Sequence, residues 1–207
     1  MERENLQLDS EIQENYRRLH LLKQQVFLAF AHVKLEDGIG FFEAGAIDDY
    51  FKPTDKEYQE EKARDEREDW TKVYAFLENL ENFDQSRDCF MDAKGLHFYL
   101  PIILLLYDNN RLEILIESWI EEKNPKNFVL KNLLTDEQKM AIIATIEYEV
   151  DYDRTVEFYE NFKGQKCHNC GKIHCPESYT REEAIAKVES SDEFLMLQKM
   201  KNYFNNK

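Results

Sequence analysis

The strongest chemical signal in this 207-residue sequence is a run of metal-ligand side chains near its C-terminal end. The candidate ligands are Cys167, Cys170, His174 and Cys175. A Cys-x-x-Cys-Gly turn lets two thiolates bind one metal ion, and soft or borderline ligands suit Zn²⁺ far better than hard cations. We therefore expect a structural, tetrahedral Zn²⁺ site, whose fourth ligand is His174, His168 or a remote group.

Other uses of these cysteines stay open: thiols in a loop, a redox pair, or a fragment of an iron–sulfur site. A thioredoxin-type pair would follow a strand and open a helix, whereas the stretch before Cys167 has a helical pattern. The sequence has no second Cys-x-x-Cys, so the pattern is shorter than that of a zinc ribbon. Cys89 stands alone and is interpreted as a core or boundary thiol.

A second group of side chains with possible chemistry surrounds a turn at Gly38 and Gly40. Its members are His32, Glu36, Asp37, Glu43, Asp48 and Asp49. Asp48 and Asp49 could hold a cation or act with His32 as an acid–base pair, as in a metal-dependent hydrolase. Hydrolytic metal sites usually combine several histidines with carboxylates, so a solvated acidic surface is the alternative. We assign no catalytic residue, since the sequence has no Ser-His-Asp order and no phosphate-binding glycine loop.

A third group lies between Glu147 and Glu160, where acidic residues alternate with tyrosines. The candidate partner-binding residues are Glu147, Glu149, Asp151, Tyr152, Asp153 and Glu157. Tyrosine anchors surrounded by carboxylates would fit a cationic cleft on another protein. The alternative is an ordinary helix whose aromatic residues face inward and whose acids face water.

The overall charge favours the same kind of partner. The chain has 42 acidic and 27 basic residues, a formal net charge of −15, which disfavours nucleic acids and anionic membranes and favours a basic protein. The first residues form no apolar signal segment, and the longest apolar run, Leu100 to Tyr107, is too short to span a bilayer. We expect a cytoplasmic protein with reduced cysteines.

The elements that must position these groups are helices. Glycine (6) and proline (4) are scarce, and apolar residues recur at spacings of three and four, so the sequence predicts an all-α fold. We predict a compact multi-helix core over residues 1–163. A Cys-rich metal-binding loop with two C-terminal helices, packed on this core, is expected over residues 164–207.

Capping boxes and helix-breaking residues predict where the helices begin and end. Boxes at Ser10, Thr54 and Thr135 predict helix starts, the first helix running to about His32 and the third to Phe162. Further helices are expected over 41–51, 70–80, 93–99, from about Pro101 and over 111–122. The run Ile102 to Tyr107 is apolar on every side and predicts a central buried helix. The charged stretch 55–69 is interpreted as a solvated helix or an ordered linker, with ion pairs such as Glu60–Arg64.

An aromatic string in the middle of the chain is interpreted as packing. It reads Phe90-Met-Asp-Ala-Lys-Gly95-Leu-His-Phe98-Tyr99-Leu100-Pro101. Gly95 would permit a backbone reversal, Asp92 would cap the following helix, and His97 would be a satisfied core histidine. The predicted structural residues are Trp70, Gly95, Phe98, Tyr99 and Pro101.

Together with Trp70 and the later Leu134-Thr135-Asp-Glu-Gln138, this string resembles an uncharacterised bacterial family of unknown function. Its members share the pattern Phe-Leu-Asp-x-x-Gly-x-x-Phe-Tyr-Leu-Pro followed by Leu-Thr-x-x-Gln. The resemblance covers roughly Leu21 to Tyr159. It implies a compact helical domain and no activity, and by loose analogy a place near toxin–immunity systems.

We therefore expect a non-enzymatic, acidic binding protein, of which an immunity-type inhibitor of a basic toxin or nuclease is one form. The alternatives are a metal-dependent hydrolase built on His32, Asp48 and Asp49, and a zinc-stabilised regulatory or adaptor protein.

Overall fold

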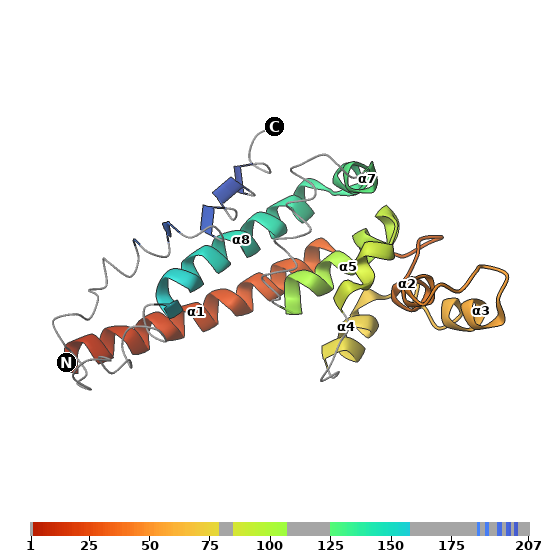
Figure 1. The fold of residues 1–207 in the computed structure, drawn as a ribbon. Helices are drawn as coiled ribbons and strands as arrows, with labels where there is room; N and C mark the ends of the chain where they lie inside the picture. Colours follow the sequence, from red (N-terminus) through yellow and green to blue (C-terminus); the bar gives the residue numbers. More distant parts are fainter. Residues whose placement is uncertain are drawn as a thin grey trace. The chain divides into compact units, whose positions relative to one another are not determined.

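A computed structural model describes residues 2–78, 85–106 and 125–157, with nine further residues between 186 and 202. These residues are mostly helical and include no strand, as the sequence predicted (Figure 1). The elements are α1 (Glu2–Ala29), α2 (Phe41–Asp48), α3 (Lys56–Lys62), α4 (Trp70–Glu78), the 3₁₀ helix η1 (Gln85–Phe90), α5 (Ala93–Leu106), α7 (Pro125–Leu133) and α8 (Asp136–Glu157). None of the described helices is long and apolar enough to cross a membrane.

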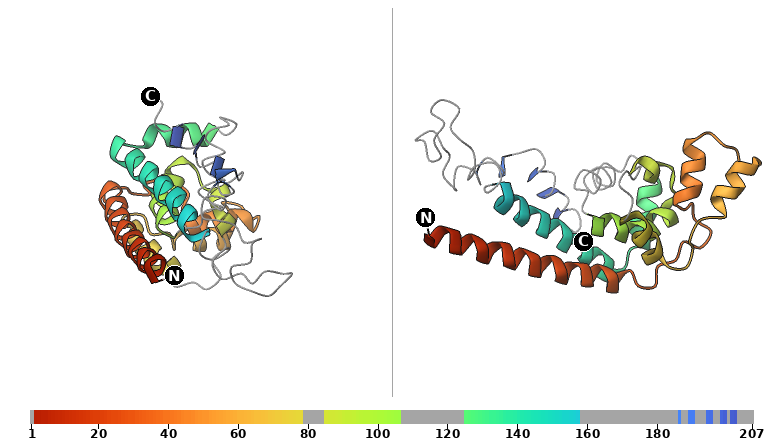
Figure 2. Two further views of the ribbon diagram at one scale, coloured as in Figure 1. Left: turned by 90° about the vertical axis from the view of Figure 1, so that its left-hand side faces the viewer. Right: turned by 90° about the horizontal axis from the view of Figure 1, so that it is seen from below.

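The chain divides into two compact units, Met1–Gln24 with Met140–Lys207, and Gln25–Lys139. In the first unit the N-terminal part of α1 and the greater part of α8 run side by side (Figures 1 and 2). The ring of Tyr148 is buried, and the Arg18 guanidinium lies 5.9 Å from its centroid. Lys201 forms an ion pair of 2.7 Å with Glu147, which ties a C-terminal residue to α8.

The second unit is built around α5. From Leu100 onward this helix is apolar on every side, and its residues Ile102, Ile103, Leu104 and Leu105 are all buried. Helices α4 and α7 pack against it, while α2 packs against α3 and η1. The predicted central buried helix is therefore confirmed.

Two distant side chains close the C-terminal end of α1. A helix end leaves carbonyl groups without a partner inside the helix, and these need other donors. The Trp70 indole N–H donates to the carbonyl of Phe30 at 2.8 Å, and the Gln138 amide donates to the neighbouring carbonyl of Ala29 at 3.2 Å. Trp70 is only 1% exposed, so its ring also fills the core.

Gln138 also forms hydrogen bonds with Thr135 and His97. The backbone N–H of Thr135 donates to Gln138 Oε1, and the N–H of Gln138 donates to Thr135 Oγ1, which is the reciprocal pattern of a capping box. Gln138 Oε1 also lies 2.9 Å from His97 Nε2. Because the Gln138 amide nitrogen is used on Ala29, His97 Nε2 is the donor in this contact. Burial lowers the pKa of His97, in keeping with a neutral, partly buried ring.

Several predicted helix ends are wrong. Helix α1 begins at Glu2, well before the box at Ser10. The residue before α3 is Asp55 rather than Thr54, and its carboxylate accepts the N–H of Lys52 instead of capping the helix. Pro101 lies inside α5 and not in the first turn of a new helix. Burial of the surrounding α5 residues stabilises the helix enough to tolerate a proline that cannot donate to the carbonyl four residues earlier.

Gly95 also has a role that differs from the predicted one. It lies inside the first turns of α5 rather than at a backbone reversal. A Cβ at this position would overlap the carbonyl oxygen of Ile39, so glycine is needed because another part of the chain approaches closely. Asp92 Oδ1 accepts the N–H groups of both Gly95 and Ile39, at 2.8 and 3.1 Å, so the predicted cap also holds the loop before α2.

Candidate functional site

Helix α2 carries Glu43 and Asp48 of the second predicted group, with Asp49 directly after it, and is the centre of the candidate site. It is short and apolar, and Phe41, Ala44 and Ala46 are buried. An eight-residue helix is marginal by itself in water, so its position depends on contacts at its two ends.

The N-terminal end of α2 is capped by a residue from a distant loop. The local N-cap residue, Gly40, has no side chain to offer, and Asp65 takes its place. The Asp65 carboxylate accepts the N–H of Phe42 at 2.8 Å and the N–H of Glu43 at 3.1 Å. These are donors that the first turn leaves unpaired, and a negative charge there also complements the helix dipole.

Glycine at position 40 permits this arrangement. A Cβ built on Gly40 would overlap the Asp65 carboxyl group. Burial raises the pKa of Asp65, and the two backbone N–H donors oppose that shift by favouring the carboxylate.

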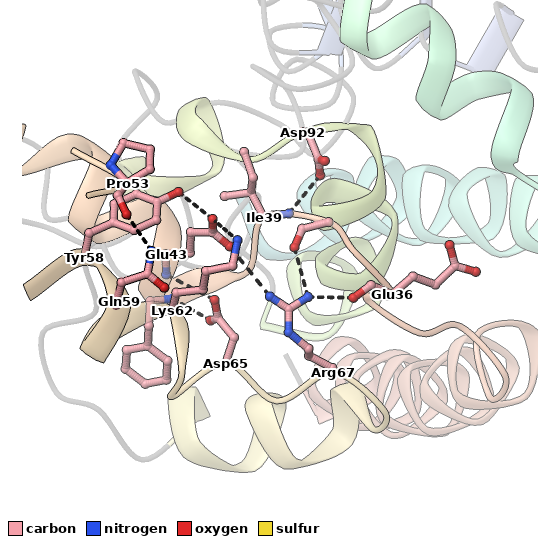
Figure 3. Close-up of polar contacts among 12 residues, drawn as sticks. Glu36, Ile39, Glu43, Pro53, Tyr58, Gln59, Lys62, Asp65, Arg67 and Asp92 are labelled. Atoms are coloured by element: carbon pink, nitrogen blue, oxygen red, sulfur yellow. Dashed lines mark hydrogen bonds and ion pairs between the residues drawn. The ribbon is translucent and has the colours of Figure 1, made fainter. Parts of the chain in front are cut away.

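The Glu43 side chain, in the same first turn of α2, is the most deeply buried carboxylate described in the structure. It is 2% exposed and is surrounded by donors from α3 and the loop that follows it (Figure 3). Glu43 Oε1 accepts the Tyr58 hydroxyl at 2.5 Å and the Lys62 ammonium at 2.6 Å. Arg67 Nη2 lies 3.7 Å from Oε2, an oxygen that accepts no hydrogen bond from the described residues.

Arg67 and Tyr58 link this carboxylate to the surrounding chain. The Arg67 guanidinium donates to the carbonyl of Glu36 at 2.6 Å and to that of Gly38 at 3.3 Å, so it connects the α1–α2 loop to Glu43. The Leu35 N–H donates to the carbonyl of Arg67 at 2.9 Å in return. Burial, with the hydrogen bond to Glu43 second, raises the pKa of Tyr58 to about 12, so this hydroxyl stays protonated at neutral pH.

The C-terminal end of α2 has a different design. The N–H of Phe51 donates to the carbonyl of Ala46, and the N–H of Tyr50 donates to that of Ile47, each at 3.0 Å. This is a Schellman motif, and its first residue beyond the cap adopts a left-handed backbone conformation, for which glycine is the usual residue. Here that residue is Tyr50, with a φ of 63°.

The Tyr50 side chain is also 92% exposed. A non-glycine residue in this conformation costs about 1 kcal/mol or more, and no burial of the ring offsets that cost. Asp49 precedes it and is exposed, Asp48 is half-buried, and the following Phe51 is 37% exposed. We call residues Asp48–Phe51 the 48–51 turn.

The other acids of the second predicted group do not assemble around His32. Glu36 and Asp37 both pair with Lys94, at 2.7 and 2.5 Å, and Glu43 is enclosed as described. His32 is exposed in the turn after α1. Within the part of the chain that the structure describes, no three His, Cys, Asp or Glu side chains form a group that could hold a metal ion.

One comparison with known proteins found a match. A family described as "Family of unknown function (DUF6714)" matches residues 19–163. The chain belongs to this family. The match covers the region that sequence resemblance had marked, and it includes α2, the 48–51 turn and the aromatic string. No curated protein and no solved structure matches the chain.

The third predicted group falls at the end of the DUF6714 region, on α8. Glu147 is about half exposed and is paired with Lys201, while Tyr148, which alternates with these acids, is buried. The side chains of Glu149, Asp151, Tyr152, Asp153 and Glu157 lie outside the described residues, so their role stays a prediction.

The predicted zinc ligands also lie outside the described residues. Cys167, Cys170, His174 and Cys175 follow the last described residue of α8, and they lie beyond the DUF6714 match as well. The zinc site and the domain boundary at residues 163/164 therefore stay predictions.

Sequence reasoning missed five residues of the site, namely Tyr50, Tyr58, Lys62, Asp65 and Arg67. Asp65 and Arg67 sit in a charged stretch that looked solvated, and only their contacts with a segment 22 or more residues earlier reveal their function. Tyr50 had a detectable signal: an acidic pair followed by two aromatic residues at the end of an apolar helix, with Pro53 just beyond.

Proposed function

We propose that this DUF6714 protein is a non-enzymatic binding protein that uses the 48–51 turn to contact a basic protein partner. The observation that supports this most directly is Tyr50, a large aromatic side chain that is 92% exposed in a backbone conformation suited to glycine. Strained residues that the surrounding structure holds in place are typical of functional sites.

The composition of the turn fits a cationic surface. Tyrosine is among the residues most enriched at binding hot spots, because its ring covers a large area and its hydroxyl can form a hydrogen bond. Asp49, the preceding residue, adds an exposed carboxylate, and the net charge of −15 attracts a basic partner over a longer range. The form of binding protein that we propose is an immunity-type inhibitor that occupies the cationic cleft of a toxin or nuclease.

The contacts at the N-terminal end of α2 support a binding role for the 48–51 turn. The contacts of Asp65 and Glu43 restrict the helix that presents the turn, so Tyr50 loses less conformational freedom when a partner binds. An anchor that is already ordered binds more tightly for the same contact area.

The test is partner capture from the protein's own host cells with three matched variants. Tyr50→Ala removes the ring but keeps an L-residue in the strained conformation, and Asp49→Lys reverses the neighbouring charge. Tyr16→Ala removes another exposed tyrosine, 70% exposed on α1, and serves as the control. We expect a basic protein to be retained by the wild type and the control and lost from both turn variants. Equal capture by all variants would refute the assignment of the 48–51 turn.

A triple charge reversal on α8 separates the two candidate surfaces. The variant carries Asp151→Lys, Asp153→Lys and Glu157→Lys. If it loses the partner while Tyr50→Ala keeps it, the binding surface lies on α8 and not on the turn.

A further inference from the structure

A second feature of the Gln25–Lys139 unit has a different chemistry: a pocket of about 180 Å³ between the start of α2, the loop before α4, α4 and the first turns of α5. Its walls are mainly apolar. Five aromatic residues contribute to them, namely Phe41, Phe42, Phe76, Phe98 and Tyr99.

The rings of this pocket are held by one another. Phe41 stacks on Tyr99 with 6.1 Å between centroids and meets Phe42 edge to face at 5.4 Å. Phe42 in turn lies 5.7 Å from Phe76, whose side chain is 45% exposed. The pocket therefore reaches the surface beside Phe76 and the exposed side chains of Arg64 and Lys72, while Phe41, Phe98 and Tyr99 form its buried walls.

The charged groups around the pocket already have partners within the chain. Arg64 lies over the ring of Phe42 at 4.0 Å and pairs with Glu61 at 2.6 Å. Lys72 pairs with Glu66 at 3.1 Å, and the Asp65 carboxylate accepts two backbone N–H groups of α2. A charged ligand would have to displace one of these partners, so the pocket favours an uncharged one.

The volume sets the size of the ligand. An engineered apolar cavity of about 150 Å³ in another protein binds benzene. A pocket of 180 Å³ is therefore large enough for one six-membered ring with a small substituent. Aromatic walls add edge-to-face and offset-stacked contacts that an aliphatic ring cannot form.

We propose that this pocket binds an uncharged, single-ring aromatic group. The group could belong to a small molecule or to a phenylalanine or tyrosine side chain of a peptide, and the chemistry of recognition is the same. This proposal does not depend on the 48–51 turn, because the pocket and the turn share no residue.

The methionine methyl groups give a direct test in the full chain. Met91 lines the pocket and is 2% exposed, whereas Met140 is outside it and 56% exposed. In a ¹³C-methyl spectrum, phenol should shift the Met91 signal saturably and leave the Met140 signal in place. Cyclohexanol, which lacks the π system, and benzoate, which is charged, should bind about three- to tenfold more weakly than phenol.

Two variants test whether the Met91 shift depends on the side chains that line the pocket. Phe76→Ala removes a half-exposed wall without emptying the core and should weaken phenol binding, while Phe51→Ala, at an exposed aromatic residue outside the pocket, should not. N-acetyl-phenylalanine amide distinguishes the two sources: if it shifts Met91, the pocket accepts a peptide side chain, and if only phenol does, it accepts a small molecule. An unmoved Met91 signal, equal shifts of Met91 and Met140, or equal affinity for cyclohexanol would overturn the proposal.

Discussion

The two ends of α2 are built in opposite ways. At the N-terminal end, side chains from distant segments hold the helix: Asp65 caps it, and Tyr58, Lys62 and Arg67 surround its own buried carboxylate, Glu43. At the C-terminal end, a local Schellman motif holds an exposed tyrosine in a conformation that favours glycine. The difference suggests that one end secures the helix and the other presents a surface, and four predictions test this division.

The largest effect is expected from Glu43→Gln. The substitution keeps the shape of the side chain but removes the charge that faces Lys62 and Arg67, and it places an amide where Oε2 accepts no hydrogen bond from the described residues. We expect the free energy of unfolding to fall by about 2–3 kcal/mol, measured by chemical denaturation. A loss below about 0.5 kcal/mol, the level of an ordinary surface change, would contradict a securing role for this end.

The second prediction concerns the remote cap. Asp65→Ala should cost about 1–2 kcal/mol, as the loss of a helix cap does. Gly40→Ala should be costly in the wild type, because its Cβ overlaps the Asp65 carboxyl group, and much less costly when Asp65 is already alanine. A double-mutant cycle measures this coupling, and additive effects would show that the two residues act independently.

The third prediction concerns Tyr50 at the C-terminal end of α2, where a substitution is expected to raise the free energy of unfolding rather than lower it. Tyr50→Gly should raise the free energy of unfolding by up to about 1 kcal/mol, because glycine adopts the left-handed conformation without strain. Tyr50→Ala keeps an L-residue there and should leave stability nearly unchanged. If Tyr50→Gly destabilises the protein instead, the ring has a structural role and the comparison fails.

The smallest effect is a difference in pH dependence. Burial raises the pKa of Asp65 above its ordinary value of 3.8, so the folded protein binds this proton more readily than the unfolded chain. The part of the Asp65 contribution that depends on binding this proton is therefore fully present below its ordinary pKa and is lost as the pH rises through the folded pKa, whereas the cap hydrogen bonds from Phe42 and Glu43 do not need the proton.

The measurement compares the wild type with Asp65→Asn, which cannot titrate, by denaturation between roughly pH 3.5 and 6. The stability of the wild type relative to the variant should fall across this range. Tyr50→Ala, at the other end of α2, should show the same pH dependence of stability as the wild type. If the stability of Asp65→Asn changes with pH in parallel with the wild type, protonation of Asp65 is not the cause of the pH dependence.

The sequence predicted the parts of this fold that depend on neighbouring residues. The all-α class, the central buried helix and the box from Thr135 to Gln138 all follow from spacings of three or four residues, and the structure confirms them. Pro101 was misplaced because a local rule for proline cannot weigh the burial of the whole helix around it.

The contacts that define the candidate site join residues far apart in the chain. Asp65 caps a helix that begins 24 residues earlier, at Phe41, and Trp70 donates to a carbonyl 40 residues away. No local pattern indicates such pairings. The carboxylates at positions 43, 48 and 49 were identified as one group, but the structure separates them into one that secures the helix and two in the exposed turn.

The most direct test of the central claim is site-specific photo-crosslinking in host cells. A benzophenone amino acid replaces Tyr50 in one variant and Tyr16, the exposed tyrosine on α1, in another. We predict that the Tyr50 probe crosslinks a basic protein that also binds the purified wild type and fails to bind purified Tyr50→Ala, while the Tyr16 probe does not crosslink it. Crosslinking of the same protein from both positions, or from neither, would contradict the claim that the 48–51 turn is the binding surface.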